Sequence, residues 1–257
     1  EVAGYGGRFL DGDAVSAAPV DGGFEVRLAD GRSVLGRRLL VTTGLVDELP
    51  AVPGLREQWG HGVLHCPYCH GWEVRDQAIG ILATSPMSVH QALMWRQWSD
   101  DVTLFLHAQA EPTDEEWEQL AARGVSVVVG EVAAVESDGN RLTGVRLTSG
   151  QVVPRDALVV APRFTARSAV LESLGLPVEP VEAMGHVLGS AVPATPVGST
   201  DVPGVWVAGN VTDLMAQVIG AAAAGLKAGA GLNGDLIAEE TRLAVAARRA
   251  ASSPRAG

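Results

Sequence analysis

The alternation of apolar and polar residues predicts strands and helices that follow one another in a regular order. Three predominantly apolar runs are typical of strands buried on both faces of a parallel sheet: 78–83, 102–106 and 158–160. Residues 88–98 have apolar side chains at helical spacing, and residues 115–122 predict a second helix that begins near Thr113. Residues 125–129 predict a further strand. This strand–helix–strand order is typical of a dinucleotide-binding fold.

A hairpin that precedes the last of these strands occurs twice in the chain. Residues 26–41 (VRLADGRSVLGRRLLV) align without a gap with residues 145–160 (VRLTSGQVVPRDALVV), at an offset of 119. Each copy contains an alternating strand, a turn, a second short strand and an apolar run that is typical of a buried parallel strand. The repeat therefore predicts an α/β fold with two Rossmann-like dinucleotide-binding domains, one inserted in the other. Each domain has a three-layer ββα architecture.

The first copy contains only the later part of this topology. Its strand–turn–helix opening, which would bind a nucleotide pyrophosphate, should lie before residue 1. We therefore expect a chain that is truncated at its N-terminus; a naturally shortened domain is the alternative. The predicted first domain comprises residues 1–49 and 178–257, and residues 50–177 form the inserted domain. Residues 46–50 and 176–181, with their prolines and short apolar runs, predict the two crossovers.

Composition and charge indicate which classes of binding partner the protein does not fit. Apolar residues make up 47% of the chain and charged residues 19%, which is enough for a sizeable core. The net charge of −11 argues against nucleic acid and against an anionic membrane surface, because both require a basic face. The sequence has no apolar run of about 18 residues, the length that a membrane span needs. No metal site is predicted.

The two cysteines, Cys66 and Cys69, are separated by two residues. A structural disulfide that closes so short a loop stabilises a fold little, so the spacing favours chemistry. In a Cys-X-X-Cys motif at a helix start, one thiolate attacks a substrate disulfide and the other resolves the mixed disulfide. Residues 66–70 also match the haem-attachment pattern Cys-X-X-Cys-His. Two further interpretations are a zinc site that includes His65 and His70, and a pair of buried thiols without chemistry.

With two such domains and this pair, the chain resembles the thioredoxin reductase-like flavoproteins from about residue 24 to residue 239. In that family Cys-X-X-Cys, an acidic residue and Gly open a helix in the pyridine-nucleotide domain; Cys66, Cys69 and Gly71 match. His70 stands where the family usually has Asp as a proton donor, and histidine can do this near neutral pH. The resemblance implies that Cys66, Cys69 and His70 are catalytic. It makes Cys66 the more exposed sulfur and places Cys69 nearer the flavin.

The resemblance also implies a binding site for FAD. Residues 205–210 (VWVAGN) look like the closing flavin motif of the family, a strand that ends in Ala-Gly-Asp. Gly209 matches, and Asn210 replaces the Asp that binds the ribityl chain. Further contacts are implied at the start of the helix under the flavin pyrimidine edge, at Ala216, Gln217 and Val218. A weaker match follows the first apolar strand, at Thr42, Thr43 and Gly44.

The NADPH site of the family is not matched. Residues 83–88 (ATSPMS) contain no glycine where the family has a glycine-rich loop, and Pro86 lacks an N–H donor. The arginine pair that would bind the 2′-phosphate is absent from residues 107–111, where Glu111 would repel a phosphate. NAD(P)H is therefore a doubtful cofactor.

These features predict an FAD-dependent thiol–disulfide oxidoreductase that cycles a Cys66–Cys69 disulfide against the flavin. We expect a dithiol oxidase or a disulfide reductase that does not use NADPH. An NADPH-dependent thioredoxin-disulfide reductase and a non-catalytic truncated remnant are the alternatives. The expected partner is a small dithiol or disulfide, or a thioredoxin-like protein. The resemblance implies a cytoplasmic homodimer.

Overall fold

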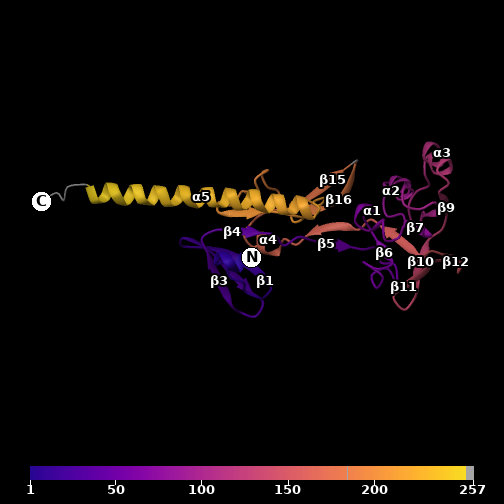
Figure 1. The fold of residues 1–257 in the computed structure, drawn as a ribbon, viewed down its shortest axis with the longest axis horizontal. Helices are drawn as coiled ribbons and strands as arrows, with labels where there is room; N and C mark the ends of the chain where they lie inside the picture. The colour runs from indigo at the N-terminus through magenta and orange to yellow at the C-terminus, as the bar shows by residue number, and fades with distance from the viewer. Residues whose placement is uncertain (184, 253–257) are drawn as a thin grey trace. The chain divides into compact units, whose positions relative to one another are not determined.

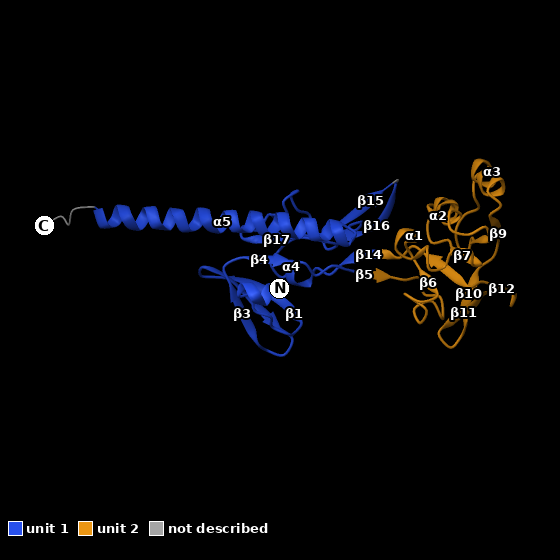
Figure 2. Cartoon of the chain, in the orientation of Figure 1, with its two compact units in different colours: residues 1–46, 164–257 blue, residues 47–163 orange. Residues whose placement is uncertain are grey.

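The computed structural model describes residues 1–183 and 185–252, which form two compact units (Figure 1, Figure 2). The first unit combines residues 1–46 and 164–257, and the second comprises residues 47–163. Residues 184 and 253–257, which fall in the predicted segment 178–257, lie outside the described part.

The chain returns to the first unit earlier than residue 177, the last residue of the predicted inserted domain. Strand β14 (Arg163–Ala166) pairs in parallel with β16 (His186–Ala191), so residues from Phe164 onward pack with the first unit. The assignment of flavin and nucleotide binding to the two units stays a prediction.

A five-stranded parallel sheet lies at the centre of the second unit, in the order β6-β13-β7-β8-β9. Its strands are β6 (Val63–Leu64), β7 (Ile79–Leu82), β8 (Val102–Phe105), β9 (Ser126–Val128) and β13 (Ala157–Val160). Every residue of β7, β8 and β13 is buried, which confirms the continuous apolar pattern at these positions.

Helices cover one face of this sheet and an antiparallel meander covers the other. The helices are α2 (Ser88–Trp95) and α3 (Asp114–Ala122), and the meander is formed by β10 (Val132–Asp138), β11 (Arg141–Leu147) and β12 (Val152–Pro154). Alternate residues of β13 belong to different cores, because side chains alternate across a strand. Ala157 and Val159 pack with the helices, whereas Leu158 and Val160 pack with the meander. The three layers of the predicted Rossmann-like fold are therefore present.

The described strands of the first unit belong to three small sheets. Strands β1 (Ala14–Val20), β2 (Gly23–Leu28) and β3 (Ser33–Gly36) are antiparallel, and β4 (Leu39–Val41) pairs in parallel with β17 (Val205–Val207). The third sheet has the order β15-β16-β14-β5, with β15 (Glu179–Ala183) and β5 (Leu45–Glu48) at its edges. The last two residues of β5, Asp47 and Glu48, belong to the second unit. The helical segments are a 3-10 turn (Val2–Tyr5), α4 (Ala169–Glu172) and α5 (Val218–Ser252). No described helix, α5 included, is long and apolar enough to cross a membrane.

The repeat in the sequence appears as a repeat in strand register. Val26 lies opposite Val34 in the first unit, and Val145 lies opposite Val153 in the second. Both pairs are related by the offset of 119. The prediction of buried strands after both hairpins is wrong in part: Leu40 of β4 is 36% exposed, because among the described strands β4 has only β17 as a neighbour.

Candidate functional site

The two cysteines lie at the start of a short helix in the second unit. Helix α1 (Pro67–His70) follows β6, and Cys66 is its N-cap residue with extended backbone angles. Pro67 occupies the first helical position, where its missing N–H costs nothing. The N–H groups of Cys69 and His70 both donate to the carbonyl oxygen of Cys66, at 3.2 and 3.1 Å. This single turn holds both sulfurs on one side of the chain, as the Cys-X-X-Cys spacing predicts.

The relative exposure of the two thiols differs from the expectation. Cys69 is exposed and Cys66 is half-buried, so the prediction that Cys66 is the more exposed sulfur is wrong. Cys66 follows the buried residues Val63 and Leu64 and precedes the buried Pro67, whereas the neighbours of Cys69 in the chain, Tyr68 and His70, are exposed.

The two thiols are joined by a hydrogen bond. The interaction with Cys66 is the largest cause that raises the pKa of the Cys69 thiol, and partial burial adds to it. The Cys69 thiol therefore keeps its proton to a higher pH than an ordinary cysteine does.

A cavity of about 260 Å³ opens beside the pair. Its lining includes both cysteines together with Asp47, Trp59, His65 and His70. Burial lowers the pKa of His65, and the negative charge of Asp47 opposes that shift. A neutral imidazole therefore lies beside the thiol pair near pH 7.

Sequence reasoning found His70 in this cavity but assigned no redox role to His65, and it missed Asp47 and Trp59. His65 directly precedes Cys66, whereas Asp47 and Trp59 reach the cavity only through the fold, so no motif spacing joins those two to Cys66. Within residues 1–183 and 185–252, no three His, Cys, Asp or Glu side chains are grouped to hold a metal ion. The zinc interpretation has no support in this part of the chain.

The predicted flavin residues of the first unit lie together at one edge of a sheet. Val207 of β17 is paired with Val41 of β4, and the N–H of Ala208 donates to the carbonyl oxygen of Val41 at 3.3 Å. Thr42, Thr43 and Gly44 therefore follow one strand, and Gly209 and Asn210 follow its parallel neighbour. The structure brings these two groups together.

The glycines at this edge have backbone angles that favour glycine. Gly44 has φ of 72° and Gly209 has φ of 80°, so a side chain at either position would be strained. Thr43 uses its hydroxyl to donate to the carbonyl oxygen of Arg167 at 2.6 Å. Thr43 therefore joins the end of β4 to the segment after β14. Because the hydroxyl proton is used in this bond, the Thr43 hydroxyl could contact a cofactor only as a hydrogen-bond acceptor.

Asn210 is held by the loop that leads into α5. Its Nδ2 donates to the carbonyl oxygens of Asp213, Leu214 and Ala216, at 3.2, 3.3 and 2.9 Å. A carboxylate could not donate to these carbonyls, which explains an amide at this position. No described residue donates to Oδ1 of Asn210, so this oxygen is free to accept from a hydroxyl group of a ligand.

The last predicted flavin residues lie at the beginning of α5. Ala216 is half-buried, and Gln217 and Val218 are exposed. Helix N-termini present N–H groups that favour negative charge. The positive-φ glycine, the free acceptor of Asn210 and this exposed helix start fit the ribityl and pyrimidine parts of FAD.

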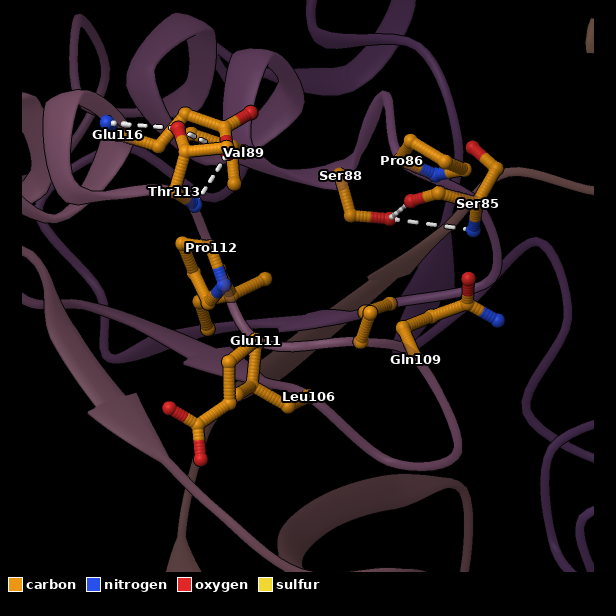
Figure 3. A pocket seen from close by; sticks show the side chains of 13 residues that line it. Ser85, Pro86, Ser88, Val89, Leu106, Gln109, Glu111, Pro112, Thr113 and Glu116 are labelled. Carbon is orange, nitrogen blue, oxygen red and sulfur yellow. Dashed lines mark hydrogen bonds between the residues drawn. The ribbon is translucent and has the colours of Figure 1, made fainter.

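The expected nucleotide position in the second unit is a cavity of about 290 Å³ between the turn after β7 and the segment after β8 (Figure 3). Ser85, Pro86 and Ser88 line one side, and Gln109 and Glu111 line the other. All of these residues belong to the two segments, 83–88 and 107–111, in which the sequence lacks the glycines and arginines of an NADPH site.

Comparison with known proteins gives consistent matches. The family model described as pyridine nucleotide-disulphide oxidoreductase matches residues 8–229. The "Thioredoxin reductase tcpT" of Claviceps purpurea (strain 20.1) is 29% identical over 250 residues, which cover 90% of this chain and 73% of that protein. The crystal structure of HlmI is similar with a TM-score of 0.85 and 42% identity, over 98% of this chain and 78% of that chain. The oxidoreductase from Agrobacterium tumefaciens is similar with a TM-score of 0.80 and 32% identity, over 89% and 74% of the two chains.

Proposed function

The chain belongs to the pyridine nucleotide-disulphide oxidoreductase family, and from that premise we propose that it is an FAD-dependent dithiol oxidase. It is a thioredoxin reductase-like oxidoreductase that acts on sulfur groups. The finer proposal concerns the electron source: a substrate dithiol supplies the electrons, and NADPH does not.

The observation that carries the proposal is the contrast between two sites in one unit. Cys66 and Cys69 share a cavity with His65 and His70, which is the set of groups that thiol–disulfide exchange requires. The cavity at the nucleotide position is lined by Glu111 and Pro86 and by no glycine. The thiol chemistry is thus supported by the residues present, and dinucleotide binding is not.

The exchange uses the pair as a disulfide. A substrate thiolate attacks the sulfur of Cys66, which forms a mixed disulfide and releases Cys69. The second substrate thiolate then attacks the substrate sulfur of that mixed disulfide. This step closes the substrate disulfide and releases Cys66, so the pair has gained two electrons.

Proton transfer accompanies both steps. The neutral His65 is the base that takes a proton from a substrate thiol in the cavity, and Cys69 is protonated through His70 when it is released. Bound FAD would supply a two-electron acceptor for the reduced pair, from which the electrons could go on to an acceptor such as oxygen. The residues proposed to hold it are Thr42, Thr43, Gly44, Gly209, Asn210, Ala216, Gln217 and Val218.

An NADPH-dependent reductase of a thioredoxin-like protein is the second candidate. It is favoured by the name of a similar protein, "Thioredoxin reductase tcpT". In that case the same exchange at Cys66 runs in the opposite direction, and the partner is a protein disulfide.

Anaerobic reduction of the FAD-loaded protein separates the two candidates. We expect a small dithiol to bleach the flavin absorbance within seconds, and NADPH to leave it oxidised. The control is the double variant Cys66→Ser/Cys69→Ser, whose flavin should remain oxidised with either reagent. Rapid bleaching by NADPH would favour the reductase and overturn the proposal.

A further inference from the structure

The turn between β7 and α2 has a hydrogen-bond pattern that bears on nucleotide exclusion. In a dinucleotide-binding domain, the turn after the first strand presents free backbone N–H groups to the pyrophosphate, at the start of the following helix. The corresponding turn here is residues 83–88. The partners of its N–H groups therefore show how many of the donors of this turn are open to a pyrophosphate.

Every backbone donor from residue 84 to residue 88 is already used or absent. The N–H groups of Thr84 and Ser85 both donate to Oγ of Ser88, at 3.2 and 3.5 Å. Pro86 has no N–H. The N–H of Met87 donates to Oγ of Ser85 at 3.3 Å, and that of Ser88 donates to the carbonyl oxygen of Ser85 at 3.0 Å.

The hydroxyl of Ser88 lies at the centre of this arrangement. It accepts from the N–H groups of Thr84 and Ser85 and donates to the carbonyl oxygen of Ser85 at 2.7 Å. The dashed lines in Figure 3 mark the two bonds between Ser88 and Ser85. A hydroxyl has one proton to donate and two lone pairs, so its capacity is filled. Ser88 is only 3% exposed. Its oxygen therefore accepts the hydrogen bonds that a phosphate oxygen would accept in a dinucleotide site.

We propose that Ser85 and Ser88 act as an internal latch that closes this turn against a dinucleotide pyrophosphate. The proposal rests on the proposed NADPH-independent function and names the residues that produce it. To bind, a pyrophosphate must displace the Ser88 hydroxyl, which would leave a buried polar group without its partners. The cavity offers no compensation, because the residues that line it include Glu111 and Glu116 and no cationic side chain.

The test measures binding and does not involve flavin reduction. NADH is the probe, because it lacks the 2′-phosphate that Glu111 would repel and so isolates the pyrophosphate. We expect Ser88→Gly to raise the affinity for NADH about tenfold or more, measured by the change in NADH fluorescence. Ser88→Ala, which removes only the hydroxyl, should change the affinity in the same direction.

Thr84→Val is the matched control in the same turn. The Thr84 hydroxyl donates to the carbonyl oxygen of Ala161 at 3.0 Å, so this variant loses a hydrogen bond but leaves the latch intact. Its affinity for NADH should equal that of the unchanged protein.

Amide hydrogen exchange provides a second readout that does not depend on the folding of a variant. The N–H groups of Thr84 and Ser85 should exchange slowly in the unchanged protein, and fast exchange would overturn the latch. An unchanged NADH affinity in both Ser88 variants, or tight NADH binding by the unchanged protein, would also overturn it. Failure of a dithiol to reduce the flavin would instead overturn the proposed function, and the NADH affinities would still decide the latch.

Discussion

At the scale of single residues, two properties of the thiol pair point to different sulfurs. Exposure favours attack on Cys69, whereas the hydrogen bond to Cys66 raises the pKa of the Cys69 thiol and so makes Cys69 the poorer leaving group. In the last step of dithiol oxidation the cysteine that carries the substrate leaves as a thiolate, and a better leaving group leaves faster. Both sulfurs line the same cavity, so exposure does not exclude either. We therefore assign the mixed disulfide to Cys66.

Serine variants test this assignment. Serine keeps a hydrogen bond in each direction, so Cys69→Ser leaves Cys66 with a donor, and Cys66→Ser leaves Cys69 with an acceptor. At pH 7, Cys66 in the Cys69→Ser variant should react several-fold faster with a small disulfide reagent than Cys69 in the Cys66→Ser variant. Mass spectrometry of the mixed disulfides over time gives both rates. Equal rates, or a faster Cys69, would contradict the assignment.

His65 gives a prediction with a defined pH dependence. Burial lowers its pKa in the folded chain below the ordinary 6.5, so the unfolded chain binds the proton more readily. The free energy of unfolding should therefore decrease as the pH falls through about 6.5, the ordinary histidine value.

Asp47→Asn should lower the pKa of His65 further, because the charge of Asp47 raises it. An NMR titration of the imidazole measures this, with Glu48→Gln on the same strand as the control; a higher pKa in Asp47→Asn would refute the pairing.

At the scale of elements, the features that the sequence predicts are those with local causes. The sequence predicts a helix that begins near Thr113, and the structure confirms this with a full capping box, in which the Glu116 carboxylate accepts from the N–H of Thr113 at 2.8 Å. The exposure of Leu40 could not be predicted, because β4 pairs with a strand far away in the chain. The cavity beside His65 could not be predicted, because it depends on how residues 47–70 fold back on one another. At the turn that contains Ser88, the sequence predicted only the absence of glycines. It could not predict the hydrogen bonds of the Ser88 hydroxyl, because residue spacing does not give the direction of a side chain.

The loop before α5 gives a prediction about a single amide. Asn210→Asp restores the residue that the resembling family uses, but it removes the NH2 group whose two protons are shared among three carbonyl oxygens and places a charge beside those oxygens. We expect it to lower the free energy of unfolding by about 1–2 kcal/mol, since the site is partly solvated. Urea denaturation measures the change. Asn233→Asp, at an exposed position of α5, is the control and should change stability by less than about 0.5 kcal/mol. Equal losses in both variants would contradict the role given to the Asn210 amide.

At the scale of the whole molecule, each unit has its own hydrophobic core. The two clusters of the second unit lie within residues 47–163, and the two clusters of the first unit lie within residues 1–46 and 164–257. No described cluster combines residues of both units. The internal repeat predicts this arrangement, because a complete copy of the topology contains the strands and helices that a core needs. The position of the second boundary was not predictable, since it depends on the pairing of β14 with β16.

Separate cores predict that the second unit folds by itself. The segment 47–163 has a five-stranded sheet covered on both faces, and its fully buried side chains include Trp95, Phe105 and Leu158. Expressed alone, it should unfold cooperatively with a free energy of about 5–15 kcal/mol, as typical domains do. Far-UV circular dichroism in urea tests this.

The control is the same segment with Trp95→Ala, which should lose about 3–5 kcal/mol because it leaves a cavity among α2, α3 and the sheet. The isolated segment should also react with a thiol reagent at Cys66 and Cys69, since the whole cavity of the pair lies within it. A non-cooperative transition, or an identical one in the Trp95→Ala variant, would mean that the second unit requires the first in order to fold.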